Sequence, residues 1–248
     1  YTCQIWGFSS NVSSIVSTGY GRINFYYQDD RLDFMEPRLD SIVVLNEENE
    51  VVRSVSLYQR YAHATLFDNR SDYTNVGSSR DDVTYRMFLD SVIIRDTQGD
   101  KSLKYSFEYN NLNDLPVRLS YSQDHWGYFN GKSNSSLLPD EIPSNIKSSY
   151  FSGIAGSRMS ADRNPDYLYA QKGLLSKVNY PTGGYTTYEY EAHSFGDPIV
   201  AHGGVRLKKQ SSYIKDNQVA FVNSYSYSDG SASLYNIQYY YYKEINKG

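Results

Sequence analysis

The chain repeats one pattern, in which an apolar strand leads through a polar turn into a second, alternating strand. One copy spans residues 39–58 and starts Leu39-Asp40-Ser41, and another spans 89–109 and starts Leu89-Asp90-Ser91. A third occupies 175–190, and a looser fourth runs from Val205 to Tyr227. Self-similarity of this kind is typical of a fold built from one repeated unit. The unit here has the alternation and turn residues of a β-hairpin.

Alternation within the strands predicts which side chains share a face. In the second copy, Leu103, Tyr105, Phe107 and Tyr109 alternate with polar residues, and we expect these four to be buried while Lys104, Ser106 and Glu108 stay exposed. The 27 tyrosines suit a pleated surface that is wet on at least one side. We therefore predict an all-β fold of antiparallel hairpin repeats in an extended, twisted sheet or a partly wrapped shell.

One short helix is expected in this fold. Asn164 is a good N-cap, Pro165 suits the first helical position, and Gly173 suits the position after the end. These signals predict a helix over Pro165–Lys172.

Two turns carry distinct signals. The third copy turns at Pro181-Thr182-Gly183-Gly184, and a last hairpin is predicted at Asp229-Gly230. The structural turn residues are therefore Pro181, Gly183, Gly184, Asp229 and Gly230, and at least one glycine in each turn should have a positive φ.

The organisation along the chain follows from where the repeats fall. Hairpin repeats fill residues 1–110, an irregular aromatic and polar region fills 111–163, and further hairpin repeats fill 164–248. We expect these segments to form one continuous domain cut from a longer protein, with 70–82 as a polar loop. Tyr235–Tyr242 carries tyrosines on both faces and is the expected exposed edge, where strand-to-strand self-association would occur.

Composition and motifs exclude several classes of function. The net charge is −4 with both signs interspersed, so no basic stripe is available for nucleic acid. No apolar run reaches the ~18 residues of a membrane helix. The four histidines lack metal-ligand spacing, and Cys3 is the only cysteine. With no catalytic motif present, the sequence predicts no enzyme activity, no metal site and no cofactor.

One dense polar and aromatic cluster remains as a candidate ligand site. It contains Asp124, His125, Trp126, Tyr128 and Asn130. An aromatic ring could stack on a sugar face while the polar groups bond its hydroxyls. The same residues also suit a tight loop in which Asp124 initiates a turn and Trp126 is a buried plug. The loop interpretation is favoured, and it predicts a buried Trp126.

The segment 173–191, with its Tyr-Pro-Thr-Gly-Gly turn, resembles the divergent Rhs/YD-repeat family of large secreted or surface proteins of Bacteroidetes-type bacteria. The Gly203-Gly204-Val205-Arg206 run and the 124–131 block resemble further motifs of that family. The resemblance implies a non-catalytic β-sheet scaffold module in an exported bacterial protein, located outside the cell or on its surface. Its partner would be the rest of its own longer polypeptide, and an effector often follows in such proteins. The alternative is a glycan- or protein-binding surface module that uses exposed Tyr and Trp.

Overall fold

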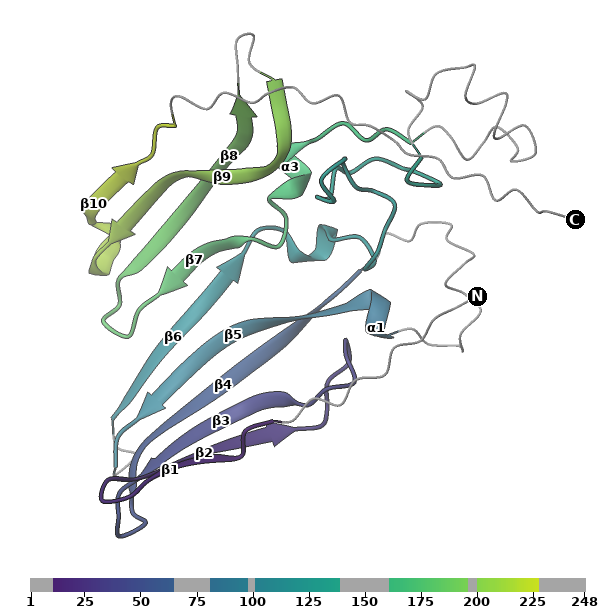
Figure 1. Cartoon of the computed structure of the whole chain (residues 1–248). Helices are drawn as coiled ribbons and strands as arrows, with labels where there is room; N and C mark the ends of the chain where they lie inside the picture. Colours follow the sequence, from purple (N-terminus) through teal and green to yellow (C-terminus); the bar gives the residue numbers. More distant parts are fainter. Residues whose placement is uncertain (1–10, 65–80, 98–100, 139–160, 196–199, 228–248) are drawn as a thin grey trace, which may run out of the picture.

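The described chain forms one antiparallel sheet whose strands follow each other in sequence order. The computed structural model describes residues 11–64, 81–97, 101–138, 161–195 and 200–227. Within these residues ten strands pair in the order β1 to β10, and β1 and β10 are the two edges (Figure 1). The sheet does not close into a barrel. This confirms the expected all-β fold of antiparallel hairpins.

The strands are longest in the middle of each hairpin series. Their bounds are β1 Ser14–Ser17, β2 Gly21–Gln28, β3 Arg38–Leu45, β4 Val51–His63, β5 Tyr85–Arg95, β6 Ser102–Tyr109, β7 Leu175–Asn179, β8 Tyr185–Phe195, β9 Val200–Tyr213 and β10 Val219–Ser224. β6 pairs directly with β7, so the hairpins before and after the irregular region belong to one sheet.

Two of the hairpin turns, in the first and third copies, share one closure. In the third copy the N–H of Tyr180 donates to the carbonyl of Gly184 (2.9 Å), and the N–H of Gly183 donates to the carbonyl of Tyr180 (3.0 Å). Pro181 is the next residue of the turn, and its ring fixes its own φ at a value that suits this position. Gly183 has φ +86°. The first copy has the same pair of bonds, with Asn49 at φ +62° in place of the glycine.

Gly184 is required for a different reason, because a Cβ there would lie 2.5 Å from the backbone oxygen of Tyr213. The predicted positive φ is thus confirmed at Gly183. Asp229 and Gly230, and the expected edge Tyr235–Tyr242, lie outside the described residues.

The repeats also share a β-bulge that the sequence interpretation did not foresee. In each copy, a residue that directly follows a leucine has no pairing partner on the preceding strand. These unpaired residues are Asp40, Asp90, Ser176 and Lys208. A bulge of this kind bends a strand and increases its twist. The fourth copy is therefore aligned on Leu207 rather than on Val205, and the start Leu-Asp-Ser of the first two copies is the sequence of a bulge.

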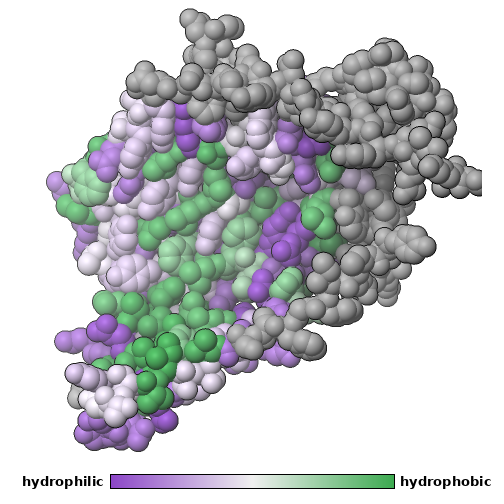
Figure 2. All heavy atoms as spheres, viewed as in Figure 1, coloured by the Kyte–Doolittle hydropathy of each residue, from purple (hydrophilic) through white to green (hydrophobic). Residues whose placement is uncertain are grey.

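Apolar side chains line up in rows across the first half of the sheet. Phe25, Ile42, Val55, Ile94 and Leu103 lie opposite one another in consecutive strands. Figure 2 shows hydrophobic side chains gathered over the lower strands of the viewed face and paler ones above them. A second row, four residues further along β6, crosses β6–β9 as Phe107, Val178, Thr186 and Ser212, and its side chains change from apolar to hydroxyl-bearing.

Burial along β6 is weaker than alternation predicts. Tyr105, Phe107 and Tyr109 are only half-buried, and Leu103 is 49% exposed. Lys104 and Glu108 are exposed as expected, while Ser106 is half-buried. The prediction of four buried side chains was wrong because no second layer covers this part of the sheet, among the residues described. Within the described part of the chain, neighbouring side chains of the sheet are what covers these residues.

The helices are short and differ from the expectation in two ways. α3 spans Tyr167–Ala170 rather than Pro165–Lys172, and its N-cap is Asp166, whose carboxylate accepts the N–H of Leu168 at 3.0 Å. A second helix, α1, spans Asp81–Thr84, so the expectation of a single helix was wrong. The 3₁₀ turns η2 Leu112–Asp114 and η4 Lys215–Asn217 complete the described elements. No helix in the described part of the chain is long and apolar enough for a membrane span.

Candidate functional site

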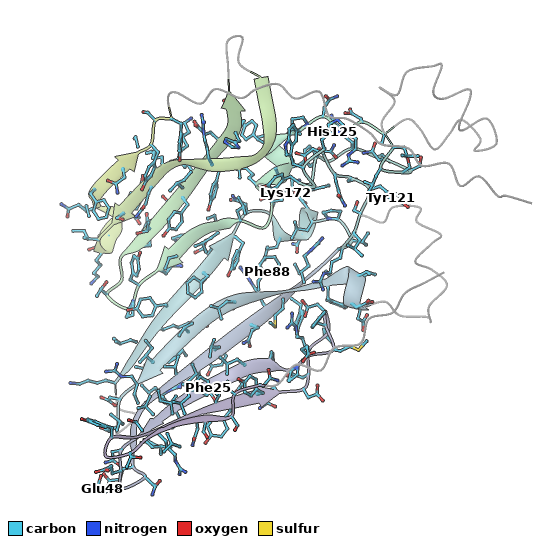
Figure 3. All side chains as sticks on the ribbon, viewed as in Figure 1. Phe25, Glu48, Phe88, Tyr121, His125 and Lys172 are labelled. Atoms are coloured by element: carbon cyan, nitrogen blue, oxygen red, sulfur yellow. The ribbon has the colours of Figure 1, made fainter. Side chains whose placement is uncertain are left out.

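The candidate residues lie in an irregular segment at one end of the sheet. Figure 3 shows Tyr121 and His125 there, with Lys172 next to them and Glu48 at the far end of the sheet. The segment makes a small hairpin-like loop in which Gln123 and Phe129 form an isolated bridge. The loop contains all five residues of the predicted ligand cluster.

Asp124 closes this loop from the inside. Its Oδ1 accepts the N–H groups of Trp126 and Tyr128, each at 2.9 Å. Its own N–H donates to the carbonyl of Tyr128, and its carbonyl accepts the N–H of Gly127. Asp124 is fully buried, so this carboxylate organises backbone amides and does not face solvent.

Asn130 is also fully buried and fixes the loop to the next segment of the chain. Its Nδ2 donates to the carbonyls of Asp162 (2.9 Å) and Asn164 (3.0 Å), and its Oδ1 accepts the N–H of Lys132 (3.2 Å). Both amide protons and the oxygen therefore have protein partners. An amide satisfied in this way has little capacity left for a ligand.

Two further residues hold the loop, and sequence reasoning missed both. Asn134 donates to the carbonyls of Tyr121 and Asp162, and accepts the N–H of Asp162 at 2.9 Å. The guanidinium of Arg163 donates to the carbonyl of Asp124. No local pattern identifies them, because their partners lie 13, 28 and 39 residues away.

The loop lies against a glycine pair in β9. β8 pairs His193 with His202 and Ala192 with Val205, so it skips Gly203 and Gly204. A Cβ on Gly203 would lie 2.5 Å from Cε3 of Trp126 and 2.7 Å from Oδ2 of Asp124. A Cβ on Gly204, where φ is +87°, would lie 2.9 Å from Cζ of Tyr128. The two sequence motifs, 124–131 and 203–206, therefore meet in space, and the glycines permit the contact.

The aromatic side chains of the loop are only half-covered by this contact. Trp126 is 49% exposed and Tyr128 is 48% exposed. His125 is half-buried, and its ring lies edge-on to Trp126 with centroids 6.1 Å apart. The prediction of a buried Trp126 was wrong, since one face of the ring packs on Gly203 while the rest reaches solvent. The cluster is thus divided into buried polar residues and exposed aromatic ones.

Burial also changes the acidity of Asp124. Desolvation raises its pKa above the ordinary value of 3.8, and the N–H groups of Tyr128, Trp126 and Gly127 together with Arg163 oppose that rise. Its Oδ2 is buried against Gly203 and has no hydrogen-bond partner. An unpartnered buried carboxylate oxygen favours the protonated form.

A separate shallow pocket lies between β4 and η2. It has a volume of about 290 Å³, and its lining includes Arg60, Tyr109, Asn111 and Asn113. The Arg60 guanidinium lies 5.6 Å from the ring centre of Tyr109 and 3.7 Å from the carboxylate of Asp90. The sequence interpretation identified none of these residues as a site.

Neither a metal site nor a known relative defines the function. Among the described residues, no three His, Cys, Asp or Glu side chains gather in a way that could hold a metal ion. Comparison with family models, with curated proteins and with solved structures gave no match.

Proposed function

We propose that the chain is a non-catalytic structural scaffold module of a large, exported bacterial protein of the Rhs/YD-repeat type. The proposal rests on one observation above all: the residues that looked most like a ligand site are used to hold the fold. Asp124 and Asn130 are fully buried, and their hydrogen bonds go to backbone groups of the loop and of 162–164.

The regular sheet supports the same proposal. Its four repeat copies share one bulge position, two of them share one turn closure, and the described strands follow one another without a crossover. Such a sheet can be extended by adding hairpins at an edge, which is what a large shell-like or filament-like scaffold requires. The expected location outside the cell or on its surface belongs to the same proposal.

A second candidate, a glycan-binding module, is favoured by the exposed aromatic side chains. Trp126 and Tyr128 are each about half-exposed and lie on adjacent glycines of β9. Exposed rings of this kind can stack on sugar faces. Against this, the two polar groups expected to bind sugar hydroxyls, Asp124 and Asn130, have no exposed surface.

A glycan array with the intact chain separates the two candidates. The scaffold proposal predicts that the unmodified chain binds no glycan on the array in a saturable way. It predicts the same absence of binding for Trp126→Ala and Tyr128→Ala. Tyr20→Ala is the control, because Tyr20 is 84% exposed in the β1–β2 turn. Binding that is lost in the Trp126 and Tyr128 variants but kept in the Tyr20 variant would replace the scaffold with the glycan-binding module.

A further inference from the structure

The last described strand, β10, is an edge that no other described element covers, and a β-bulge between Val219 and Phe221 interrupts only its first half. Its sequence, Val-Ala-Phe-Val-Asn-Ser, has no charged residue and no proline, and all six residues are exposed. It pairs only with β9 among the described residues. Natural edge strands are usually blocked by lysine, proline, a cover, a β-bulge or a short length, and the part of β10 from Phe221 onward has no lysine, proline or bulge. An edge without these features is suited to receive another strand.

The backbone groups on the outer side of β10 can be assigned from its pairing with β9. The N–H of Tyr225 donates to the carbonyl of Lys208 at 3.0 Å, so the backbone N–H and C=O of Tyr225 point toward β9. The direction of the backbone groups alternates along an antiparallel strand. The N–H and C=O of Asn223 and Phe221 therefore also point toward β9, whereas those of Val222 and Ser224 point away from it. Two residues therefore present both an N–H and a C=O at the free edge.

These outward groups match a second copy of the same strand. A two-fold axis through Asn223 places Val222 opposite the second copy's Ser224, and Ser224 opposite its Val222. Each pair can then exchange N–H···O bonds in both directions. In the same register, Phe221 of each copy lies opposite Tyr225 of the other copy, which gives two such pairs. These rings are 51% and 38% exposed, and opposed aromatic pairs stabilise antiparallel strands.

We propose that two copies of this 248-residue chain associate through β10, antiparallel and centred on Asn223, so that their sheets continue into one. The two-fold arrangement closes on itself, whereas pairing of β10 with β1 of another copy would give open chains of molecules. A single strand pair buries less than the ~1,200 Å² of a standard interface, so association should be weak and should increase with concentration.

Val222→Pro tests the proposal with little effect on the fold. Proline removes the outward N–H of Val222 and leaves the bonds between β10 and β9 in place. The matched control is Val222→Thr, which keeps the N–H and the β-branched shape. We expect a weight-average mass that rises toward twice the monomer with concentration in sedimentation experiments. It should stay at the monomer in Val222→Pro and rise in Val222→Thr, with equal melting temperatures in the two variants.

Hydrogen exchange identifies the occupant of the edge. The amides of Val222 and Ser224 should exchange more slowly as concentration rises. Strict monomers at every concentration would overturn the proposal, whether those amides exchange freely or are protected by another part of the same chain. Dimers that persist in Val222→Pro, or larger oligomers in steps of one chain, would also overturn it. None of these results bears on glycan binding, so the scaffold proposal is tested separately.

Discussion

The sheet and the irregular segment beside it are stabilised in different ways. In the described part of the chain, the ten strands bury few apolar side chains, among them Leu45, Ala62 and Val178, and the small hydroxyl-bearing side chains Ser91, Thr186, Ser211 and Ser212. The segment 115–134 is much shorter, yet Leu115 and Val117 are buried in it along with four polar residues, Ser120, Asp124, Asn130 and Asn134. The sheet relies on backbone pairing and cross-strand contacts, whereas the segment relies on buried side chains that bond the backbone.

This difference predicts where single substitutions should be costly. A half-buried strand residue shares its role with neighbours on both sides, so its loss is partly compensated. A buried side chain that bonds several backbone groups has no substitute, and its removal leaves each of those groups without a partner. The irregular segment should therefore be more sensitive per residue than the regular sheet.

The largest effect is expected from Asn130→Ala. The substitution leaves the carbonyls of Asp162 and Asn164 and the N–H of Lys132 without their partner. We expect the free energy of unfolding to fall by about 3 kcal/mol in denaturant titrations. Ser133→Ala, at an exposed position three residues away, should change it by less than about 0.5 kcal/mol. Equal effects of the two substitutions would remove the distinction between the regions.

Phe107→Ala should cost less than a core substitution. A fully buried phenylalanine replaced by alanine typically costs ~3–5 kcal/mol. Because Phe107 is half-buried on an uncovered sheet, we expect a loss of about 1–2 kcal/mol. Leu103→Ala, at a side chain that is 49% exposed, should cost less again. A loss of ~4 kcal/mol at Phe107 would mean that something covers this face in solution.

The smallest effect is a pH dependence from Asp124. Since burial raises its pKa in the folded chain, the folded state binds this proton more tightly than the unfolded state. Its contribution to stability is greatest below the ordinary pKa of 3.8 and is lost as pH rises through the raised value.

The measurement compares the free energy of unfolding of the unmodified chain with that of Asp124→Asn as a function of pH. The difference between the two proteins removes the contributions of all other titrating groups, which both proteins share. Those groups include Asp33, where burial alone would raise the pKa but hydrogen bonds from Arg31 and from the N–H of Met87 bring it below its ordinary value. We expect the stability difference between the two proteins to shift in favour of the unmodified chain as pH falls. A difference that does not change with pH would contradict a raised pKa.

The sheet was largely predictable from sequence because hairpins are local. Alternation, turn residues and repeat spacing all act within about twenty residues, and they gave the strands around Asn46–Asn49 and the Gly183 turn. The bulges at Asp40 and Asp90 were present in the repeat, but a bulge becomes visible only when the neighbouring strand is known.

The site was less predictable because its contacts are distant. Asn130 meets a segment 32 residues away, and Trp126 meets Gly203 in a strand beyond α3. A single sequence shows which residues are aromatic or amide-bearing, but not which backbone carbonyls will face them. Trp126 was expected inside for the same reason: its neighbour is a glycine pair at the end of an open sheet, and not a closed core.

Hydrogen exchange on Gly203→Ala tests the central claim most directly, namely that the loop is a structural element docked on the β9 glycines. A methyl group there would lie within 3 Å of Trp126 and Asp124, so the loop must move away from β9. We predict faster exchange across 122–131, with β3–β6 unchanged, and no comparable effect from Gly19→Ala in the β1–β2 turn. Unchanged exchange in 122–131 would contradict the docking, and uniform loss of protection would contradict the distinction between loop and sheet.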